Sequence, residues 1–320
     1  MWGIMRQVDL FAGLGGFACA GEAAGLEVVA AANHWPLAVE VHALNHPAAE
    51  HYCQDLRQFD FAQLPQFELL TAGVACQGHS RGGRQGRKNS KKVAEAHEIL
   101  RSTAWAVVDC LEVCRPKFVI VENVPEFLDW TLYEVWIAAL RKLGYAMTSQ
   151  VLCASRWEVG QRRYRVFVVG IHEGEPVHVR DPDVEECGVE GIFDESIGGW
   201  IRIEDMRRTI SKRGHKTARE KVQIANERLR GALGWGQHTN YNAWGRSMSE
   251  PCPTLTTKPA MLWWVRDGQY RLWHRSELAA AMSLPRGYRF GRATRTQSSK
   301  LIGNAVPKLM AQGVIEAIVR

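Results

Sequence analysis

The sequence lacks the features that mark several protein classes. Its 320 residues contain no run of the roughly 18 uninterrupted apolar positions that a membrane span needs, so we expect no membrane association. The N-terminal MWGIMRQVDLF has neither the apolar run nor the cleavage site of a signal peptide, which predicts a cytoplasmic protein. Repeats and low-complexity tracts are missing, and 46% hydrophobic and 23% charged residues are ordinary for a globular protein. None of the eight cysteines forms a Cys-x-x-Cys pair, so we expect no metal site.

Charge is nearly balanced in total but segregated along the chain. A net charge of +6 is compatible with a nucleic-acid partner and does not require one. Residues 172–205 carry a net −9, whereas 206–246 carry +8 and both 81–101 and 286–300 carry +5. A solvated face is the simplest interpretation of any one run. Three basic segments, with Trp, Tyr, Gly and Asn interleaved in 234–247, together favour a polyanion-binding surface, from which the acidic block would face away.

The first half of the chain alternates between two periodicities. Apolar stretches predict strands, and helical spacing between them predicts helices. The predicted strands are 6–11, 27–32, 68–73, 117–122 and 165–170, and the predicted helices are 15–25, 37–46, 102–114 and 131–143. Strands that are apolar on both faces and alternate with helices are typical of an α/β fold, in which helices cover both faces of a mostly parallel sheet.

This pattern ends after Gly170. Residues 172–270 are rich in charge, Gly, Pro and Trp and contain one predicted helix near 217–233, which indicates a second, smaller domain. The last segment, KLIGNAVPKLMAQGVIEAIVR, is again amphipathic and helical. We therefore predict a catalytic domain of 1–171, completed by 271–320, and a smaller domain of 172–270.

A glycine-rich turn, DLFAGLGGF at 9–17, joins the first strand to the first helix. Gly13, Gly15 and Gly16 permit a tight turn and let a ligand approach the backbone near the helix N-terminus. The turn lacks the G-x-G-x-x-G spacing of dinucleotide sites, and no Lys-Ser/Thr follows as in a P-loop. The sequence thus favours a different adenosine-type ligand.

Two reactive groups follow neighbouring apolar strands. Cys76, in TAGVACQGHS, comes after the strand at 68–73, and the basic loop at 81–88 would favour its thiolate. Glu122 ends the strand at 117–122. If these strands pair, both groups emerge at one edge of the sheet, an arrangement that suits addition to an electron-poor heteroaromatic ring. The alternatives are an inert buried cysteine and a structurally paired carboxylate.

Three arginines precede the last of these strands in GQRRYRVFVV at 160–169. Alternation sends Arg163 and Arg165 to one face and Arg162 and Tyr164 to the other. The first pair could clamp a phosphate or orient a carboxylate such as Glu122. An exposed basic edge strand is the alternative.

In this order, the segments resemble the motifs of the DNA cytosine C5-methyltransferase family from Asp9 to about Val314, outside 172–245. The similar motifs are DLFAGLGGF, GVACQGHS, ENV at 122–124, Gln161-x-Arg163-x-Arg165, CPTLTT at 252–257 and GNAVP at 303–307. The resemblance implies a Rossmann-like, S-adenosylmethionine-dependent methyltransferase domain with a target-recognition domain within 172–270.

The resemblance also implies a mechanism. Cys76 would attack C6 of cytosine while Glu122 stabilises protonation at N3, and C5 would then accept the methyl group of S-adenosylmethionine. The target base must be flipped out of a DNA duplex, with the basic loop after Cys76 as a lid. Arg163 and Arg165 would position Glu122 and the flipped nucleotide.

The cofactor site implied by the resemblance is made of residues at several strand ends. Phe11 would stack on adenine, Asp55 would accept a hydrogen bond from its amino group, and Leu14 and Gly16 would contact the methionine part. The remaining wall would comprise His34, Trp35, Leu56, Gly73, Asn304, Ala305 and Val306.

Two positions depart from the family pattern. Ala75 stands where proline usually precedes the cysteine, which affects the rigidity of the loop. His34 stands where an acidic residue usually holds the ribose hydroxyls, and a neutral imidazole cannot grip a diol with two acceptors. We expect weaker cofactor binding or a compensating contact, with a modified S-adenosylmethionine as an alternative donor.

Double-stranded DNA is the expected partner of a monomeric enzyme, associated with the nucleoid when bound, and a restriction endonuclease is a functional partner to consider. Two alternatives stay open at this point. One is a related enzyme that acts on cytosine in RNA. The other is a catalytically inactive DNA-binding homologue that keeps the scaffold.

Overall fold

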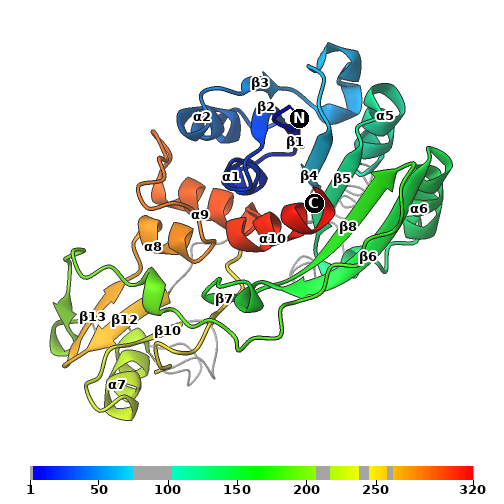
Figure 1. Cartoon of the computed structure of the whole chain (residues 1–320). Helices are drawn as coiled ribbons and strands as arrows, with labels where there is room; N and C mark the ends of the chain where they lie inside the picture. Colours follow the sequence, from blue (N-terminus) through cyan, green and yellow to red (C-terminus); the bar gives the residue numbers. More distant parts are fainter. Residues whose placement is uncertain (1–2, 75–102, 207–216, 238–244, 258–261, 320) are drawn as a thin grey trace.

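The computed structural model describes residues 3–74, 103–206, 217–237, 245–257 and 262–319. Two β-sheets organise these residues, a large one that carries most of the helices and a small one beside it (Figure 1). No helix in the described ranges is long and apolar enough to cross a membrane.

The large sheet has seven strands in the order β3-β2-β1-β4-β5-β8-β6. Its strands are β1 Arg6–Leu10, β2 Glu27–Asn33, β3 Glu50–Cys53, β4 Leu69–Gly73, β5 Phe118–Asn123, β6 Tyr145–Cys153 and β8 Tyr164–His172. The first five in sheet order are parallel, and β8 is antiparallel to both of its neighbours. The chain reverses its direction of travel across the sheet between β1 and β4. Ligands of open α/β sheets bind at such a switch point, beyond the carboxyl ends of the strands.

The predicted α/β class and the mostly parallel sheet are confirmed, and all five predicted strands exist. The apolar pattern does not predict β6, an edge strand in which Thr148, Ser149 and Gln150 interrupt the apolar run. It does not predict β3 either, because none of the four residues of β3 is buried. Continuous apolar runs identify strands covered on both faces, and edge strands do not need them.

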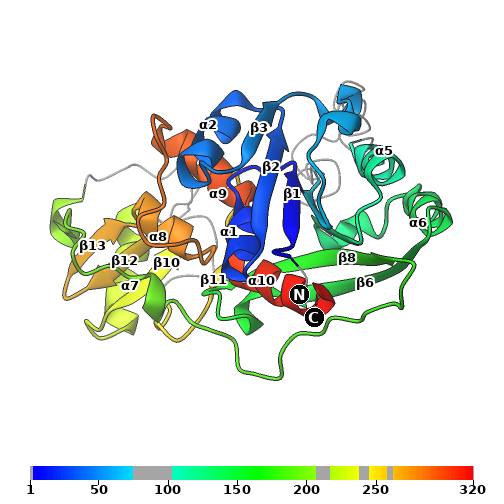
Figure 2. The ribbon, with the colours of Figure 1, turned by 45° about the horizontal axis from the view of Figure 1, so that its top comes forward.

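Helices cover both faces of this sheet, as predicted (Figure 2). One face packs against α1 (Gly16–Ala23) and α10 (Lys308–Val319), and the other against α5 (Trp105–Cys114) and α6 (Tyr133–Lys142). The helix α2 (Pro36–Asn45) follows β2. Cys110 of α5 is a buried core residue on this face of the sheet.

The small sheet is antiparallel in the order β10-β12-β13-β9. Its strands are β10 Gly234–Gln237, β12 Leu262–Arg266, β13 Gln269–Leu272 and β9 Ile201–Arg202. The helix α7 (Ala218–Arg228) packs on one face of this sheet. On the other face Trp264 stacks on Trp273 with ring centroids 4.4 Å apart. The division at 172–270 remains a prediction, and the small sheet itself extends to Leu272.

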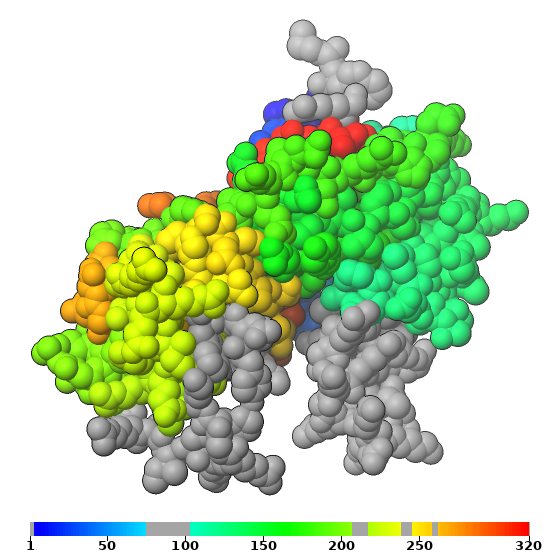
Figure 3. Space-filling model, turned by 90° about the horizontal axis from the view of Figure 1, so that it is seen from below, coloured from blue at the N-terminus to red at the C-terminus, as the bar shows by residue number. Residues whose placement is uncertain are grey.

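A two-stranded parallel ribbon links the two parts of the chain. It pairs β7 (Gln161–Arg162) with β11 (Cys252–Pro253). From below, the green surface of the β7–β8 region adjoins the yellow segment around β11 (Figure 3). Short 3-10 helices occupy Leu56–Gln58, Phe61–Gln63, Pro125–Phe127, Ala154–Arg156, Glu190–Ile192 and Ile203–Asp205.

The C-terminal region forms three helices rather than one terminal helix. They are α8 (Arg275–Ala280), α9 (Arg295–Asn304) and α10. The predicted helical segment breaks between α9 and α10, where Ala305 is extended and Pro307 follows. The α10 half packs against α1 on the large sheet, as expected of the terminal helix.

Candidate functional site

The carboxyl ends of the parallel strands bring most of the predicted site residues to one edge of the large sheet. Phe11 follows β1, His34 follows β2, Asp55 comes after β3, and Gly73 ends β4. Gly73 pairs with Glu122 of β5, so the two strands on which the prediction depended are neighbours. Cys76, with Ala75 and the basic loop after it, lies outside the described residues.

The turn after β1 has an unusual backbone. Phe11 has a φ of 54°, and Gly13 and Gly15 have φ of 55° and 84°, all in the left-handed region. Such a conformation is costly for a non-glycine residue and is often found at functional sites. The helix α1 starts at Gly16 with no side-chain cap on its N-terminus. Its first N–H groups therefore lack a side-chain partner and face the switch point of the sheet.

Gly16 lies directly against the loop between α9 and α10. A Cβ atom at Gly16 would lie 2.1 Å from the carbonyl oxygen of Val306, so only glycine fits there. A Cβ at Gly73 would lie 3.6 Å from the carbonyl oxygen of Phe11 and 3.8 Å from the Val306 side chain. The structure thus brings Phe11 and Gly16 of the glycine-rich turn together with Gly73 and Val306, from three separate segments of the chain.

Arg163 binds the loop between α9 and α10. Its guanidinium, 1% exposed, donates hydrogen bonds to the carbonyl oxygens of Gly303 and Ala305 at 3.0 Å and of Leu255 at 3.1 Å. Gln161 adds to this contact, since its Oε1 accepts a hydrogen bond from the Leu255 amide at 2.9 Å. Arg163 therefore joins the 252–257 and 303–305 segments to the strand that carries Arg165.

Arg165 forms an ion pair with Glu122. Its Nε lies 2.8 Å from Glu122 Oε1, and both side chains are less than 10% exposed. Burial raises the pKa of Glu122, although Arg165 and Arg163 lower it. The predicted alternation is observed, because Arg162 and Tyr164 are exposed on the opposite side. This ion pair is the contact expected of an arginine that orients the Glu122 carboxylate.

The proposed adenine and ribose residues lie at the ends of β2 and β3. His34 is exposed, and Trp35 is partly buried with the Lys300 ammonium 4.6 Å from its ring centroid. Asp55 accepts hydrogen bonds from the backbone amide and the guanidinium of Arg57, which lowers the pKa of Asp55, with a smaller effect of His34. Leu56 is buried behind it.

The remaining predicted wall residues divide between surface and core. Asn304 is exposed, while Leu14, Ala305 and Val306 are buried. Tyr288, which the sequence did not single out, donates its hydroxyl proton to the carbonyl oxygen of Leu14. Because Tyr288 is 274 residues away from Leu14 in sequence, no local sequence pattern predicts this contact.

Asn123 is a second residue whose role the sequence did not reveal. It is fully buried, its Nδ2 donates to the carbonyl oxygen of Val74 at 3.4 Å, and its Oδ1 accepts from the Val124 amide at 2.8 Å. Val74 comes two residues before Cys76, so Asn123 ties the Glu122 strand to the start of the cysteine loop. The sequence does contain a signal for Asn123, because this polar residue follows Glu122 at the end of an apolar strand.

A buried carboxyl group lies under the glycine-rich turn. Asp9 is 1% exposed, and its Oδ1 accepts a hydrogen bond from the Thr71 hydroxyl at 3.1 Å. Burial raises the pKa of Asp9 to about 8, so this carboxyl is mostly neutral at pH 7.

No grouping of three or more His, Cys, Asp and Glu side chains within the described part of the chain could hold a metal ion. The arrangement is instead that of a Rossmann-like methyltransferase, with a glycine-rich turn at the switch point and an acid at the neighbouring strand end.

The comparison with known proteins identifies the family. The family model for C-5 cytosine-specific DNA methylase matches residues 5–320, and the chain belongs to this family. It is 33% identical over 174 residues to the Type II methylase M.HgiEI of Herpetosiphon aurantiacus, a match of 52% of this chain and 37% of that protein. It is 31% identical over 170 residues to the Type II methyltransferase M.HhaI of Haemophilus parahaemolyticus, covering 52% and 48%. The chain thus matches about half or less of the length of these relatives.

Solved structures share the fold. A putative DNA modification methyltransferase encoded within an E. coli prophage superposes with a TM-score of 0.66 at 19% identity, covering 99% of this chain and 100% of that one. The Dnmt2 methyltransferase of S. pombe superposes with a TM-score of 0.63 at 17% identity, covering 98% of both chains.

Proposed function

We propose that this protein transfers a methyl group from S-adenosylmethionine to C5 of cytosine in duplex DNA. The observation that carries this proposal is the buried Arg165–Glu122 pair at the end of β5, one strand from the segment that leads to Cys76. Membership of the C-5 cytosine-specific DNA methylase family supports the reaction class.

The residues at the switch point fit the cofactor. Gly16 lets the Val306 backbone pack directly against the glycine-rich turn, and the uncapped N-terminus of α1 offers N–H donors to a carboxylate such as that of the methionine part. Phe11 and Gly73 would form the floor, with Asp55, Leu56, His34 and Trp35 on the adenosine side and Asn304, Ala305 and Val306 as the opposite wall. When bound, S-adenosylmethionine supplies the methyl group.

Cytosine C5 is a poor nucleophile, so the protein must activate the ring. Cys76 would form a bond from its sulfur to C6 while Glu122 holds a proton at N3, and the resulting enamine is nucleophilic at C5. Burial favours the protonated form of Glu122 that this step needs, and Arg165 fixes the orientation of its carboxyl group. After methylation, loss of the C5 proton and elimination would release Cys76.

The substrate must expose both faces of the ring, which a base in a duplex does not. We therefore include base flipping in the proposal, with the basic loop after Cys76 as the lid. The smaller domain of 172–270 would read the DNA sequence. Because curated relatives are named Type II methyltransferases, we also propose that a restriction endonuclease is the functional partner.

Transfer of a labelled methyl group tests this function. The protein is incubated with labelled S-adenosylmethionine and either duplex DNA or transfer RNA, with Cys76→Ala as the control. We expect label in cytosine of the duplex only, and none with the variant. Label in RNA alone would refute the choice of substrate, and no label in either would support the binding-only alternative.

A further inference from the structure

A pocket between the small sheet and the C-terminal helices carries an unusual set of charges. It has a volume of about 490 Å³, and the 197–201 segment, β13 with the residues after it, and the first residue of α9 line it. Arg271, Arg275, Arg295 and His274 line this pocket, and none of the described lining residues is acidic. A pocket with this charge is suited to an anion.

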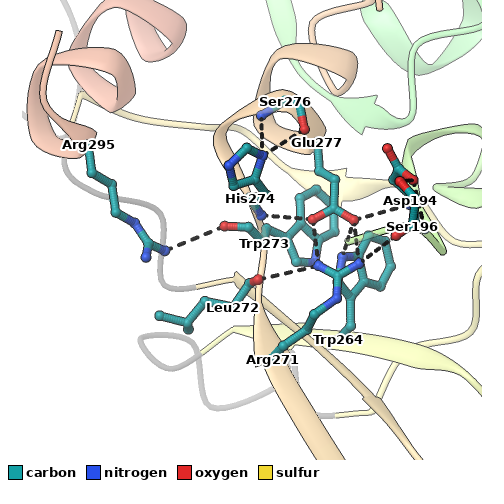
Figure 4. A network of polar contacts seen from close by, with 10 residues as sticks. All are labelled: Asp194, Ser196, Trp264, Arg271, Leu272, Trp273, His274, Ser276, Glu277 and Arg295. Carbon is teal, nitrogen blue, oxygen red and sulfur yellow. Dashed lines mark hydrogen bonds and ion pairs between the residues drawn. The ribbon is translucent and has the colours of Figure 1, made fainter. Parts of the chain in front are cut away.

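One wall of the pocket is rigid and already neutralised. Arg271 and Glu277 are both buried and form two hydrogen bonds of 2.8 Å with each other (Figure 4). Glu277 also accepts hydrogen bonds from Trp264 Nε1 at 2.9 Å and from the His274 amide at 2.7 Å. The charge of Arg271 is therefore compensated, and this arginine shapes the pocket rather than supplying net charge to it.

Arg275 and Arg295 supply the net charge. Both are exposed, and neither has a carboxylate within 4.0 Å among the described residues. Arg275 lies 5.7 Å from the centroid of the Phe290 ring, and Arg295 reaches from α9 to the carbonyl oxygen of Trp273 at 3.4 Å (Figure 4). These contacts hold the two side chains at the pocket, and the 286–300 segment adds no acidic residue that could neutralise them.

The other wall is apolar and open. Ile201 is 45% exposed, and a Cβ at Gly198 or Gly199 would meet no atom within 4 Å. Exposed apolar side chains, glycines that allow close approach and two uncompensated arginines suit a chain that alternates between sugar carbons and phosphate groups. A small free anion would not need the apolar wall.

The position of the pocket connects it to the proposed reaction. Arg295 is the first residue of α9, and Asn304 of the cofactor wall is the last. Nine steps of about 1.5 Å place them roughly 14 Å apart. The pocket and the cofactor wall therefore lie at two ends of one rigid helix.

We propose that Arg275 and Arg295 bind the phosphodiester backbone of the substrate DNA at phosphates outside the target base pair. This inference rests on the proposed function. The two arginines set the register of the duplex on the enzyme and act as positioning residues, since neither lies at the strand ends that carry Glu122.

The test measures DNA affinity as a function of salt for the Arg275→Ala/Arg295→Ala double variant. Each lost phosphate contact reduces the slope of log K against log salt by about 0.9. We expect the slope to fall by about 1.8 and the Kd at 150 mM salt to rise about tenfold. The matched control is Arg141→Ala/Lys142→Ala, which removes two exposed cations from α6, across the molecule from α8 (Figure 1). This control variant should have a salt slope and a Kd that are within twofold of those of the unmutated protein.

Replacing single phosphates of the DNA identifies those that the two arginines contact. Neutral methylphosphonate linkages are placed in turn at successive positions on either side of the target. At one or more positions the unmutated protein should bind about tenfold more weakly, whereas the affinity of the double variant should be unchanged at all of them. An unchanged slope and Kd in the double variant, with normal cytosine methylation by the unmutated protein, would overturn the inference alone. Absence of methylation by the unmutated protein would instead refute the proposed function. Competition by a mononucleotide without any effect of the methylphosphonates would assign the pocket to a small anion.

Discussion

At the scale of single residues, the proposed methyl-transfer reaction depends on groups whose protonation is set by burial. Glu122 is the central one, because the fold places it in a nearly dry position with Arg165 as its partner. Desolvation favours its neutral form and the arginines favour its charged form, and the net effect raises its pKa. Such opposed effects are typical of a carboxyl group that must hold a proton near neutral pH.

Replacement of Glu122 should therefore slow the reaction without unfolding the protein. Glu122→Gln keeps the shape and a donor but cannot exchange a proton, so we expect kcat to fall about 100-fold or more. In the unmutated protein kcat should decline as pH rises through the pKa of Glu122, and the variant should lack this alkaline limb. Methyl-transfer rates measured as the pH rises from the ordinary glutamate value of about 4.3 upward report both effects. An unchanged kcat in the variant would remove Glu122 from the mechanism.

His34 provides a test of the ribose contact. A carboxylate can accept two hydrogen bonds from a diol where a neutral imidazole accepts one, so His34→Glu should lower the Kd for S-adenosylhomocysteine about tenfold. Calorimetric titration measures this affinity without turnover, and His34→Gln serves as the neutral control. Equal affinities of all three proteins would contradict the assignment of position 34 to the ribose.

Asp9 should make the stability of the protein depend on pH. Its carboxyl ionises near the ordinary value of about 4 when unfolded but only at about 8 when folded. Between these values the folded state binds one more proton, so this contribution to stability is present below pH 4 and is lost as pH rises to 8. Asp9→Asn removes this pH-dependent loss, so between pH 5 and pH 8 we expect its stability to rise by about 4 kcal/mol relative to that of the unmutated protein. Urea unfolding at both pH values measures the difference, and a constant difference would contradict the buried neutral carboxyl.

At the scale of elements, part of the fold and of the site could be predicted and part could not. Strands such as β1 and β4 are apolar on both faces and alternate with helices, so local sequence identifies them. The Arg165–Glu122 pair could also be predicted from the sequence. Strand alternation places Arg165, and the end of an apolar strand places Glu122. The edge strand β6 has no apolar run, and the carbonyl partners of Arg163 at Gly303 and Ala305 lie about 140 residues away in sequence, where no local pattern reaches.

The close contact between α1 and the loop before α10 predicts the effect of a substitution at Gly16. Gly16→Ala would place a Cβ 2.1 Å from the backbone oxygen of Val306, so the helix or the loop must move. We expect a loss of about 2 kcal/mol in stability and a cofactor affinity reduced at least tenfold. Gly191→Ala is the control, because a Cβ there would meet no atom within 4 Å and should change neither quantity. A Gly16 variant with unchanged affinity for S-adenosylhomocysteine would contradict the location of the cofactor site.

At the scale of the whole molecule, the modest net charge of +6 conceals a specific arrangement. The large sheet carries the proposed cofactor site and Glu122, and the small sheet with α8 and α9 forms an arginine pocket at the other end of α9. Arg163 and the β7–β11 ribbon join the two regions through backbone contacts. This connection gives a physical route by which DNA bound at the small sheet would be held in register with the catalytic edge.

Covalent trapping on duplex DNA that contains 5-fluorocytosine is the most direct test of a bond between Cys76 and the target cytosine. Fluorine at C5 blocks the final loss of a proton, so the Cys76–C6 bond cannot break after methylation. With S-adenosylmethionine present, we predict a protein–DNA adduct that survives denaturation and is absent with Cys76→Ala. No adduct with the unmutated protein, or an equal amount with the Cys76 variant, would contradict the proposed covalent mechanism.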